Sequence, residues 1–312
     1  MGLHQSNVAH LNQADKLKLS TPSKINMVEL AARIQPQSGE LSYAKLHQGT
    51  IKTRMATTFA VASTQRLGSH ARSTAIRWHS DLDLMVVLKR EECMWGGKLV
   101  SSNTVLERVV SDLRLRYPKT NVRRDVLAAT LDFGSTKQSL DVVPAMFHSF
   151  SDGRPIYLIP DGGGDWLKTS PAVHDRLFRQ GVLRSGNKLC KVSQLIKWWK
   201  FGRLQPIPLS SFYTDMLLVD KANCVGVKTY GECLRDFFGH LVASACANLR
   251  DPCGIAGEIP PTKTTAQRES LYQSALYASV HANAALEAEG RRQYEEANRQ
   301  WELVFNGTFL KF

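Results

Sequence analysis

Two acidic residues stand at the start of a predicted strand. Residues 82–88 (Leu-Asp-Leu-Met-Val-Val-Leu) are apolar and rich in branched side chains, which predicts a buried strand. Positions i and i+2 of a strand point to the same side, so Asp81 and Asp83 share a face. Neighbouring carboxylates repel each other and are costly to bury. We therefore expect a cation between them, and the hard ion Mg²⁺ suits carboxylate and phosphate oxygens.

A third acid, Asp141, lies in a second short apolar segment, Ser139 to Pro144, in which Pro144 is expected to end the strand pairing. Three acids on two neighbouring strands can hold two divalent ions a few ångströms apart. That arrangement supports in-line displacement at phosphorus. Asp132 is a fourth acid nearby, which we interpret as a polar residue at a strand end rather than a ligand.

Gly68 and Ser69 supply groups that could bind phosphate. A glycine lets the backbone approach a phosphate closely, and a serine hydroxyl with nearby amides can hold its oxygens. Gly-Ser alone, or Asp-x-Asp alone, is common in ordinary turns. The combination of Gly68-Ser69, the acidic pair on one strand and the acid on another is much rarer, and it favours metal-assisted displacement at phosphorus.

These residues resemble a known superfamily. Gly68-Ser69, a gap over 70–80 and Asp81-Leu82-Asp83-Leu84 match the nucleotidyltransferases related to DNA polymerase beta. With Asp141-Val142-Val143-Pro144-Ala145, the segment is most similar to the CD-NTase family. These are bacterial enzymes akin to cyclic GMP-AMP synthase and oligoadenylate synthase, which make cyclic oligonucleotide second messengers in antiphage defence. Ser73, where many relatives have Gly, and the bulky Trp78 depart from the pattern and could alter substrate choice.

The resemblance implies an α/β (α+β) fold with two lobes. Residues 1–168 would form a polymerase-beta-like nucleotidyltransferase lobe with a mixed sheet and an N-terminal helix. Residues 169–312 would form a helical, oligoadenylate-synthase-like lobe, with the active site in the cleft between the two. The change to a helical texture near residue 168 agrees with this division.

The resemblance also implies the roles of the site residues. Asp81, Asp83 and Asp141 would be catalytic and would hold two Mg²⁺ ions, with Mn²⁺ as an alternative. Gly68 and Ser69 would bind nucleotide. In the helical lobe, Lys197 would hold the donor triphosphate, and Ser211 and Phe212 would hold its base. From the residues alone, an aromatic beside a helix cap is more often part of a core.

The implied reaction joins nucleoside triphosphates (ATP, GTP, UTP or CTP) into a cyclic di- or trinucleotide and releases pyrophosphate. Regulatory proteins from a defence operon are further expected partners. One alternative is a template-free RNA or tRNA nucleotidyltransferase that uses the same acids. Another is a catalytically silent nucleotide-binding module, although three intact acids argue against it.

The composition is that of a globular protein with a basic surface. The 312 residues suffice for two lobes, and the net charge of +12 suits an enzyme that binds triphosphates. The basic residues are scattered, so a nucleic-acid ligand is compatible with the charge but not required. Neither a membrane-spanning run nor a secretory pattern is evident, which favours the cytoplasm and no membrane partner.

The six cysteines contain no C-x-x-C pair and are expected to be reduced core residues. His240, Cys246 and Cys253 imitate part of the zinc insert of animal cyclic GMP-AMP synthases. However, Ala247 stands where an adjacent cysteine would be, so a four-ligand zinc site is not predicted.

Apolar periodicity and turn residues predict the remaining elements. Residues 1–25 read as an irregular arm or a short helix, 134–137 as a hairpin turn, and 305–312 as an apolar tail that docks. Ser38 is a plausible N-cap of the first long helix. Strands are expected at 61–67, 82–88, 122–133, 138–147 and 155–160, and helices at 38–60, 101–117, 170–180, 189–201 and 230–247. One or two long helices are expected over 264–304, in which the residues spaced for burial are Leu271, Ala275, Tyr277, Ala284 and Leu286.

Overall fold

The computed structural model describes residues 21–133 and 138–310. Residues 1–20 of the predicted arm over 1–25, the hairpin turn 134–137 and the last two residues lie outside that range. The chain divides into two compact units. We call Gln35–Gln180 with Arg250–Ile259 the sheet unit, and the rest the helical unit. The division of roles between residues 1–168 and 169–312 stays a prediction.

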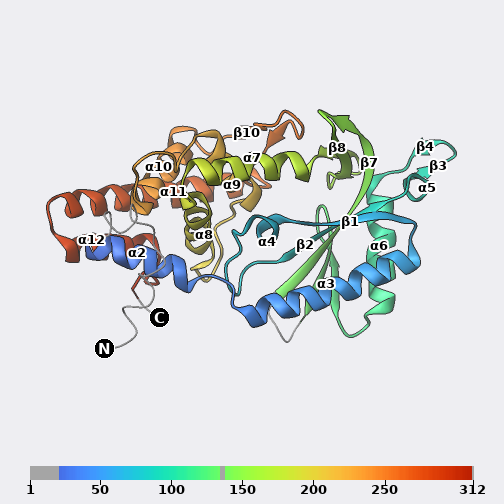
Figure 1. Ribbon diagram of the computed structural model, residues 1–312, viewed down its shortest axis with the longest axis horizontal. Helices are drawn as coiled ribbons and strands as arrows, with labels where there is room; N and C mark the ends of the chain where they lie inside the picture. Colours follow the sequence, from blue (N-terminus) through green and yellow to red (C-terminus); the bar gives the residue numbers. More distant parts are fainter. Residues whose placement is uncertain (1–20, 134–137, 311–312) are drawn as a thin grey trace. The chain divides into compact units, whose positions relative to one another are not determined.

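The sheet unit is built on a mixed seven-stranded sheet (Figure 1). Its central order is β1-β2-β7-β6-β5, and β8 pairs with β7 and with β9. The pairing of β2 with β7 is parallel, and the other pairings are antiparallel. The strands are β1 (Val61–Leu67), β2 (Leu82–Leu88), β5 (Asn121–Arg124), β6 (Ala129–Phe133), β7 (Gln138–Ser151), β8 (Arg154–Pro160) and β9 (Trp166–Thr169).

One face of this sheet is covered by two helices, α3 (Ser38–Thr58) and α6 (Ser102–Arg116). Ile51 and Met55 of α3 pack with Val109 of α6 and with Leu84 of β2 in one buried cluster. Every second residue of β2 thus faces the helices, and the residues between them face the other way. Hydrophobic burial therefore fixes which face of β2 carries Asp83.

The first long helix was expected in two respects, its presence and its N-cap residue. The helix itself is confirmed, but its N-cap is Gln37 and not Ser38. The carboxylate of Glu40 accepts a hydrogen bond of 2.9 Å from the backbone N–H of Gln37. This hydrogen bond is part of a capping box, and it satisfies the N–H of Gln37, which has no partner within the helix.

The predicted strand at 122–133 is wrong as a single element. It is two antiparallel strands, β5 and β6, and the chain reverses between them where the N–H of Asp125 donates to the Ala128 carbonyl at 2.9 Å. The predicted stop at Pro144 is also wrong, because β7 runs through it to Ser151. The pairing of β7 with β6 ends at Val142, and the pairing of β7 with β8 begins at Met146. Pro144 lies between these two points, where its missing N–H is tolerated.

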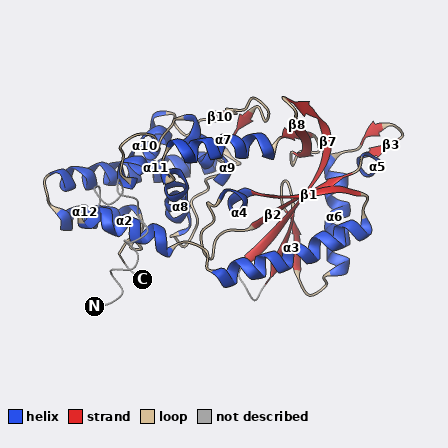
Figure 2. Ribbon diagram, viewed as in Figure 1, coloured by secondary structure: helices blue, strands red, loops and turns tan. Residues whose placement is uncertain are grey.

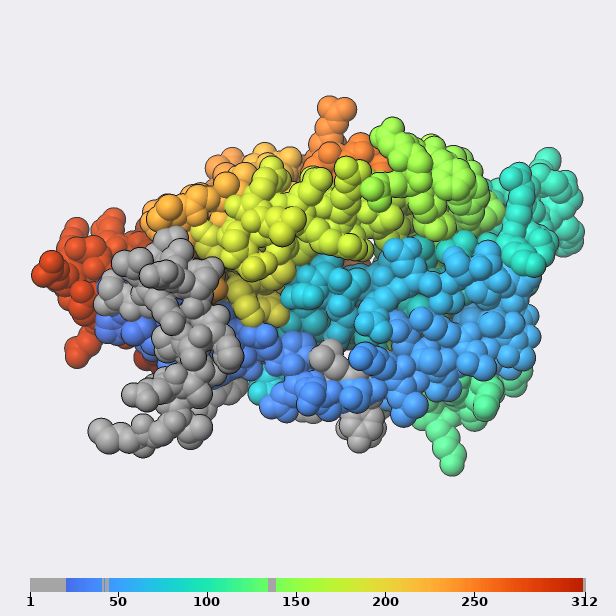
Figure 3. Space-filling model, viewed as in Figure 1, coloured from blue at the N-terminus to red at the C-terminus, as the bar shows by residue number. Residues whose placement is uncertain are grey.

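Several elements, most of them short, were not predicted. They are α2 (Pro22–Arg33), α4 (Gly68–Arg72), α5 (Arg90–Cys93), β3 (Met94–Trp95), β4 (Lys98–Leu99), β9, β10 (Leu249–Arg250) and β11 (Glu258–Ile259). The β3–β4 hairpin projects from the sheet unit (Figure 3). Strands of two residues, such as β3 and β4, carry too few alternating positions to give a periodic signal.

Helices dominate the rest of the chain (Figure 2). They are α7 (Pro171–Arg184), α8 (Lys188–Phe201), α9 (Ser211–Asp220), α10 (Tyr230–Ala243), α11 (Thr265–Gly290) and α12 (Tyr294–Val304). In the described part of the predicted tail, Phe305 and Phe309 are buried and stack with ring centroids 5.8 Å apart. Tyr277, which we expected to be buried on α11, is 44% exposed, and alanines such as Ala278 and Ala282 form the buried stripe. Within the described residues, no helix is long and apolar enough to cross a bilayer.

Candidate active site

The turn after β1 is held against an acid of β2. Leu67, the last residue of β1, pairs with Asp83, and Gly68 follows with a φ of +66°. A Cβ atom on Gly68 would overlap Oδ2 of Asp83, far inside any real contact. Only glycine fits here, for its left-handed backbone and for the close approach of the carboxylate. The structure thus brings Gly68 and Asp83 together.

Asp83 and Asp141 are neighbours across the parallel pair of β2 and β7. Both belong to the face opposite α3 and α6, because Met85 and Val143, two residues further along each strand, pack in the second buried cluster. The two carboxylates therefore start from adjacent Cα positions and point to the same side of the sheet. The predicted position of Asp141, on a strand that neighbours the strand of the acidic pair, is confirmed.

Asp81 precedes β2 and is exposed. Its Oδ1 accepts a hydrogen bond of 2.5 Å from the hydroxyl of Ser139, which lies two residues before Asp141 on β7. Its charge is close enough to disfavour ionisation of Asp141. All three predicted acids thus lie at the same end of the β2–β7 pair.

Burial raises the pKa of Asp141 to about 6. The hydroxyl of Thr130, which donates to Oδ1 of Asp141 at 2.6 Å, acts in the opposite direction, and the negative charge of Asp81 raises the pKa further. The negative charge of Asp125 raises the pKa as well, whereas the positive charge of Arg123 lowers it. The donor set of Asp81, Asp83 and Asp141 consists of carboxylate oxygens, which fits the hard ions Mg²⁺ and Mn²⁺. Metal binding by these residues stays a prediction.

Asp132, the fourth acid, is engaged elsewhere. Its Oδ2 accepts a hydrogen bond of 2.8 Å from Asn121 and lies 3.5 Å from Nε of Arg123. These contacts to β5 agree with its interpretation as a polar residue at a strand end.

The segment between the turn and the acids contains two unusual backbone conformations. Ser73 ends α4 with φ 59° and ψ 30°, and Trp78 has a φ of +66° while its side chain is 41% exposed. Left-handed conformations are costly for residues with a Cβ, above all for bulky ones. The guanidinium of Arg77 lies 3.9 Å from the ring centroid of Trp78. The two departures from the family pattern are thus also the two left-handed residues of this segment.

Lys197, Ser211 and Phe212 belong to the helical unit. Lys197 is 3% exposed, and its Nζ lies 3.8 Å from Oδ1 of Asp215, which also accepts a hydrogen bond of 2.6 Å from Ser193. A buried ammonium group of this kind is paired, as expected from the cost of desolvation. Sequence reasoning missed Asp215, although it follows the predicted Ser-Phe pair by three residues.

Ser211 and Phe212 open α9. The N-cap is Ser210, whose hydroxyl accepts from the Tyr213 N–H at 3.3 Å, so Ser211 does not serve as the cap. Ser211 and Phe212 are half-buried, whereas Tyr213 is buried and donates to the Ala247 carbonyl at 3.0 Å. Whether Ser211 and Phe212 bind nucleotide stays a prediction.

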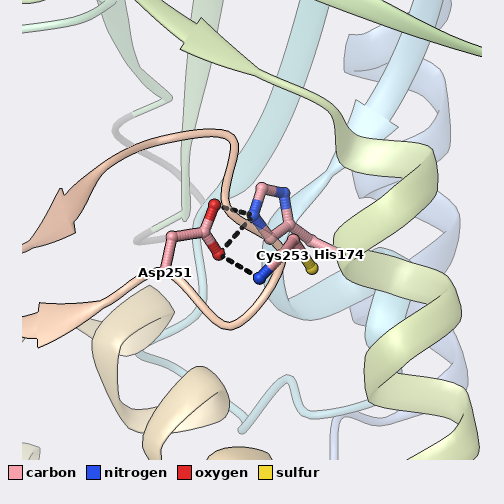
Figure 4. A group of neighbouring side chains, drawn as sticks. All are labelled: His174, Asp251 and Cys253. Atoms are coloured by element: carbon pink, nitrogen blue, oxygen red, sulfur yellow. Dashed lines mark hydrogen bonds and ion pairs between the residues drawn. The ribbon is translucent and has the colours of Figure 1, made fainter. Parts of the chain in front are cut away.

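The six cysteines are free, and four of them are buried. Cys253 lies with His174 and Asp251 (Figure 4), rather than in a described group with His240 and Cys246. The carboxylate of Asp251 accepts backbone N–H groups of residues 253, 255 and 256. Both of its oxygens also lie 3.1 Å from Nε2 of His174. With its acceptor sites already occupied, Asp251 has a structural role that needs no metal.

The chain was compared with known proteins. A family model described as Second Messenger Oligonucleotide or Dinucleotide Synthetase domain (SMODS) matches residues 23–180. A probable cyclic nucleotide synthase of Bacillus cereus (strain VD146) is 28% identical over 272 residues, which cover 78% of this chain and 80% of that protein.

Two solved structures are similar over nearly the whole chain. The E. coli MS115-1 CdnC:HORMA-deltaN complex matches with a TM-score of 0.67 and 18% identity, covering 93% of this chain and 98% of that chain. Bradyrhizobium diazoefficiens CdnG in complex with GTP matches with a TM-score of 0.68 and 16% identity, covering 93% and 97%. At such identities the likeness concerns the fold, and it confirms the predicted α/β class with a mixed sheet and C-terminal helices.

The left-handed conformation of Ser73 gives a first prediction. We expect Ser73→Gly to stabilise the protein by about 0.5 kcal/mol, because glycine adopts this conformation without the Cβ penalty. Removing that penalty outweighs the larger conformational entropy that a glycine loses on folding. The exposed Ser42→Gly in the interior of α3 is the control, and it should destabilise by about 0.5 kcal/mol. Urea unfolding measures both. A loss of stability in Ser73→Gly would contradict the argument.

A second prediction concerns Asp141 and pH. Its pKa in the folded protein, about 6, exceeds the ordinary 3.8, so ionisation costs stability as the pH rises through this interval. In EDTA, Asp141→Asn should be more stable than the wild type at pH 7.5, by up to about 3 kcal/mol, because it carries no charge. The gain should vanish near pH 3, below both pKa values, where the wild-type carboxyl is mostly protonated in both states.

Urea unfolding at the two pH values measures this difference. Asp152→Asn, in the turn between β7 and β8, is the control and should show no comparable change with pH. A pH-independent gain in Asp141→Asn would refute the electrostatic explanation.

Proposed function

The chain belongs to the SMODS family of second-messenger nucleotide synthetases, and we propose that it joins nucleoside triphosphates into a cyclic di- or trinucleotide, releasing pyrophosphate in a Mg²⁺-dependent reaction. The family resemblance seen in the motifs, that of the CD-NTases, is thereby confirmed, and the chain is a nucleotidyltransferase. The finer statements that follow, on residues, ions, substrates and biological role, are part of the proposal.

One observation carries the proposal. Asp83 and Asp141 are adjacent in the parallel register of β2 and β7, and Gly68 lies directly against the Asp83 carboxylate. Carboxylates for a metal and a backbone turn for a phosphate are therefore side by side. When bound by Asp81, Asp83 and Asp141, Mg²⁺ would activate the acceptor hydroxyl and neutralise charge on the departing pyrophosphate.

The other groups of the chain would bind and orient. The Ser69 hydroxyl and the amides of the turn would hold phosphate oxygens, as in other backbone anion sites. Lys197 would neutralise the donor triphosphate and share its charge with Asp215, and Ser211 with Phe212 would hold the donor base. Asp141 would have to be ionised to act as a ligand, and its pKa of about 6 without a metal supports ionisation at neutral pH.

The proposed substrates are ATP, GTP, UTP or CTP. GTP is the first choice for testing, since a solved relative holds it. Another relative was solved with a HORMA protein, which supports a regulatory protein partner for this chain in antiphage signalling. The proposal requires no nucleic acid as substrate, so synthesis is expected without added DNA or RNA.

The acids are tested by substitution. Asp81→Ala with Asp83→Ala should lower pyrophosphate release from the four triphosphates with Mg²⁺ by at least about 10³-fold, because the metal loses its ligands. Asp132→Ala is the matched control, since Asp132 contacts β5 instead, and it should stay within a few-fold of wild type. Undiminished release in the double variant would refute the assignment of the acids.

The product distinguishes the candidate reactions. With labelled triphosphates, a small phosphatase-resistant product that mass spectrometry resolves as a cyclic oligonucleotide supports the proposal. Lengthening of added RNA would instead indicate a template-free RNA nucleotidyltransferase. Binding of triphosphate without pyrophosphate release would indicate a silent binding module.

A further inference from the structure

The Gly68–Ser69 turn leads into a helix too short to hold itself in place. Helix α4 has five residues, Gly68–Arg72, and isolated helices of this length are not stable in water. Its first residue is fixed by the contact with Asp83, and its last turn closes where the Thr74 N–H donates to the Ser69 carbonyl at 2.9 Å. Something outside the helix must set the direction in which it leaves the sheet.

That outside contact is an ion pair between Arg72 and Asp175. Nε of Arg72 donates to Oδ1 of Asp175 at 2.8 Å, and the two side chains are only 7% and 11% exposed. The guanidinium also lies 5.8 Å from the ring centroid of Phe178, one turn further along α7. A buried, charge-assisted hydrogen bond has a narrow geometry, and breaking one partner leaves an uncompensated charge.

Asp175 is itself on a firmly held turn. The preceding residue, His174, is 1% exposed, and its Nδ1 lies 2.9 Å from the Ser170 carbonyl while Nε2 meets the carboxylate of Asp251 (Figure 4). Both nitrogens face oxygen acceptors, and Asp251 is anchored by three backbone amides of its own loop. Two adjacent residues thus hold the first turn of α7. His174 contacts Asp251 of the loop, and Asp175 contacts Arg72 of α4.

From these contacts we infer that Asp175 is a positioning residue for the reaction, which acts through Arg72 to hold Ser69 at the phosphate. The inference rests on the proposed function, in which Ser69 binds the triphosphate. Displacing a binding group by about 1 Å can cost about 100-fold in rate. Loss of the ion pair should therefore reduce catalysis out of proportion to its effect on stability.

The sheet unit offers a matched control. Arg54 of α3 and Asp112 of α6 form another largely buried ion pair, with Nε donating to Oδ2 at 2.9 Å, on the face away from the acids. Asp112→Ala and Asp175→Ala both leave an arginine without its carboxylate. A purely structural role predicts equal effects on activity once stability is matched, whereas a positioning role predicts unequal ones.

The experiment measures pyrophosphate release and amide hydrogen exchange well below the unfolding temperatures of the variants. Asp175→Ala should lower kcat/KM by about 10- to 100-fold and speed exchange over residues 68–76. Asp175→Asn keeps an oxygen acceptor and should recover most of the loss. Asp112→Ala should remain within about 2-fold of wild type in kcat/KM and exchange normally over 68–76, since its contact lies on the other face.

Equal losses of kcat/KM in Asp175→Ala and Asp112→Ala, or unchanged exchange over 68–76 in Asp175→Ala, would overturn the inference. Failure of the proposed function would look different, because the wild type would then release no pyrophosphate. In that case the exchange over 68–76 still decides whether Asp175 positions α4.

Discussion

The cost of burying a carboxyl group beside other acids is the constraint on which this structure depends. The parallel pairing of β2 and β7 sets Asp83 beside Asp141, and burial with the nearby charge of Asp81 keeps the pKa of Asp141 at about 6. Without a cation such an arrangement opposes folding, so its position in the sheet has to be imposed by other contacts. The apolar residues that alternate with the acids along β2 supply them, because they pack against α3 and α6.

Because side chains alternate between the two faces of a strand, the register of β2 with β7 decides which face carries Asp83. A shift of one residue in the β2–β7 register would turn Asp83 toward the helices and Leu84 toward the open face. The cost of burying a carboxylate among the apolar side chains of α3 and α6 excludes that alternative. The same burial that stabilises the fold thus selects the face on which the acids meet.

Much of this could be predicted from the sequence, and the reason is physical. The apolar run of β2, the acids beside it and the Gly68-Ser69 pair are local signals in the sequence, although the contact that requires glycine at position 68 is with Asp83 on the paired strand. Contacts between distant segments gave no such signal. Arg72 and Asp175 are 103 positions apart, and the pairing of Lys197 with Asp215 was not predicted either. Charged residues read from a sequence do not reveal their partners.

The errors in the sheet have a similar origin. Residues 122–133 look continuous because Asp125 and its neighbours carry no glycine or proline to mark the reversal. Pro144 looks like a strand end, but whether a proline is tolerated depends on whether its N–H would face a partner, and that depends on where β6 stops and β8 starts.

Residues with positive φ and neighbouring carboxylates lie at one end of the sheet unit, whereas its stability comes from the buried apolar clusters. Gly68, Ser73 and Trp78 all have positive φ, and all lie within the segment that joins β1 to the acids. Such conformations persist only where the surroundings over-determine them. Here the surroundings are the sheet on one side and, through Arg72 and Asp175, the anchored first turn of α7 on the other. A segment held from both sides can keep a backbone shape that favours an anionic ligand even while the ligand is absent, which lowers the ordering cost of binding.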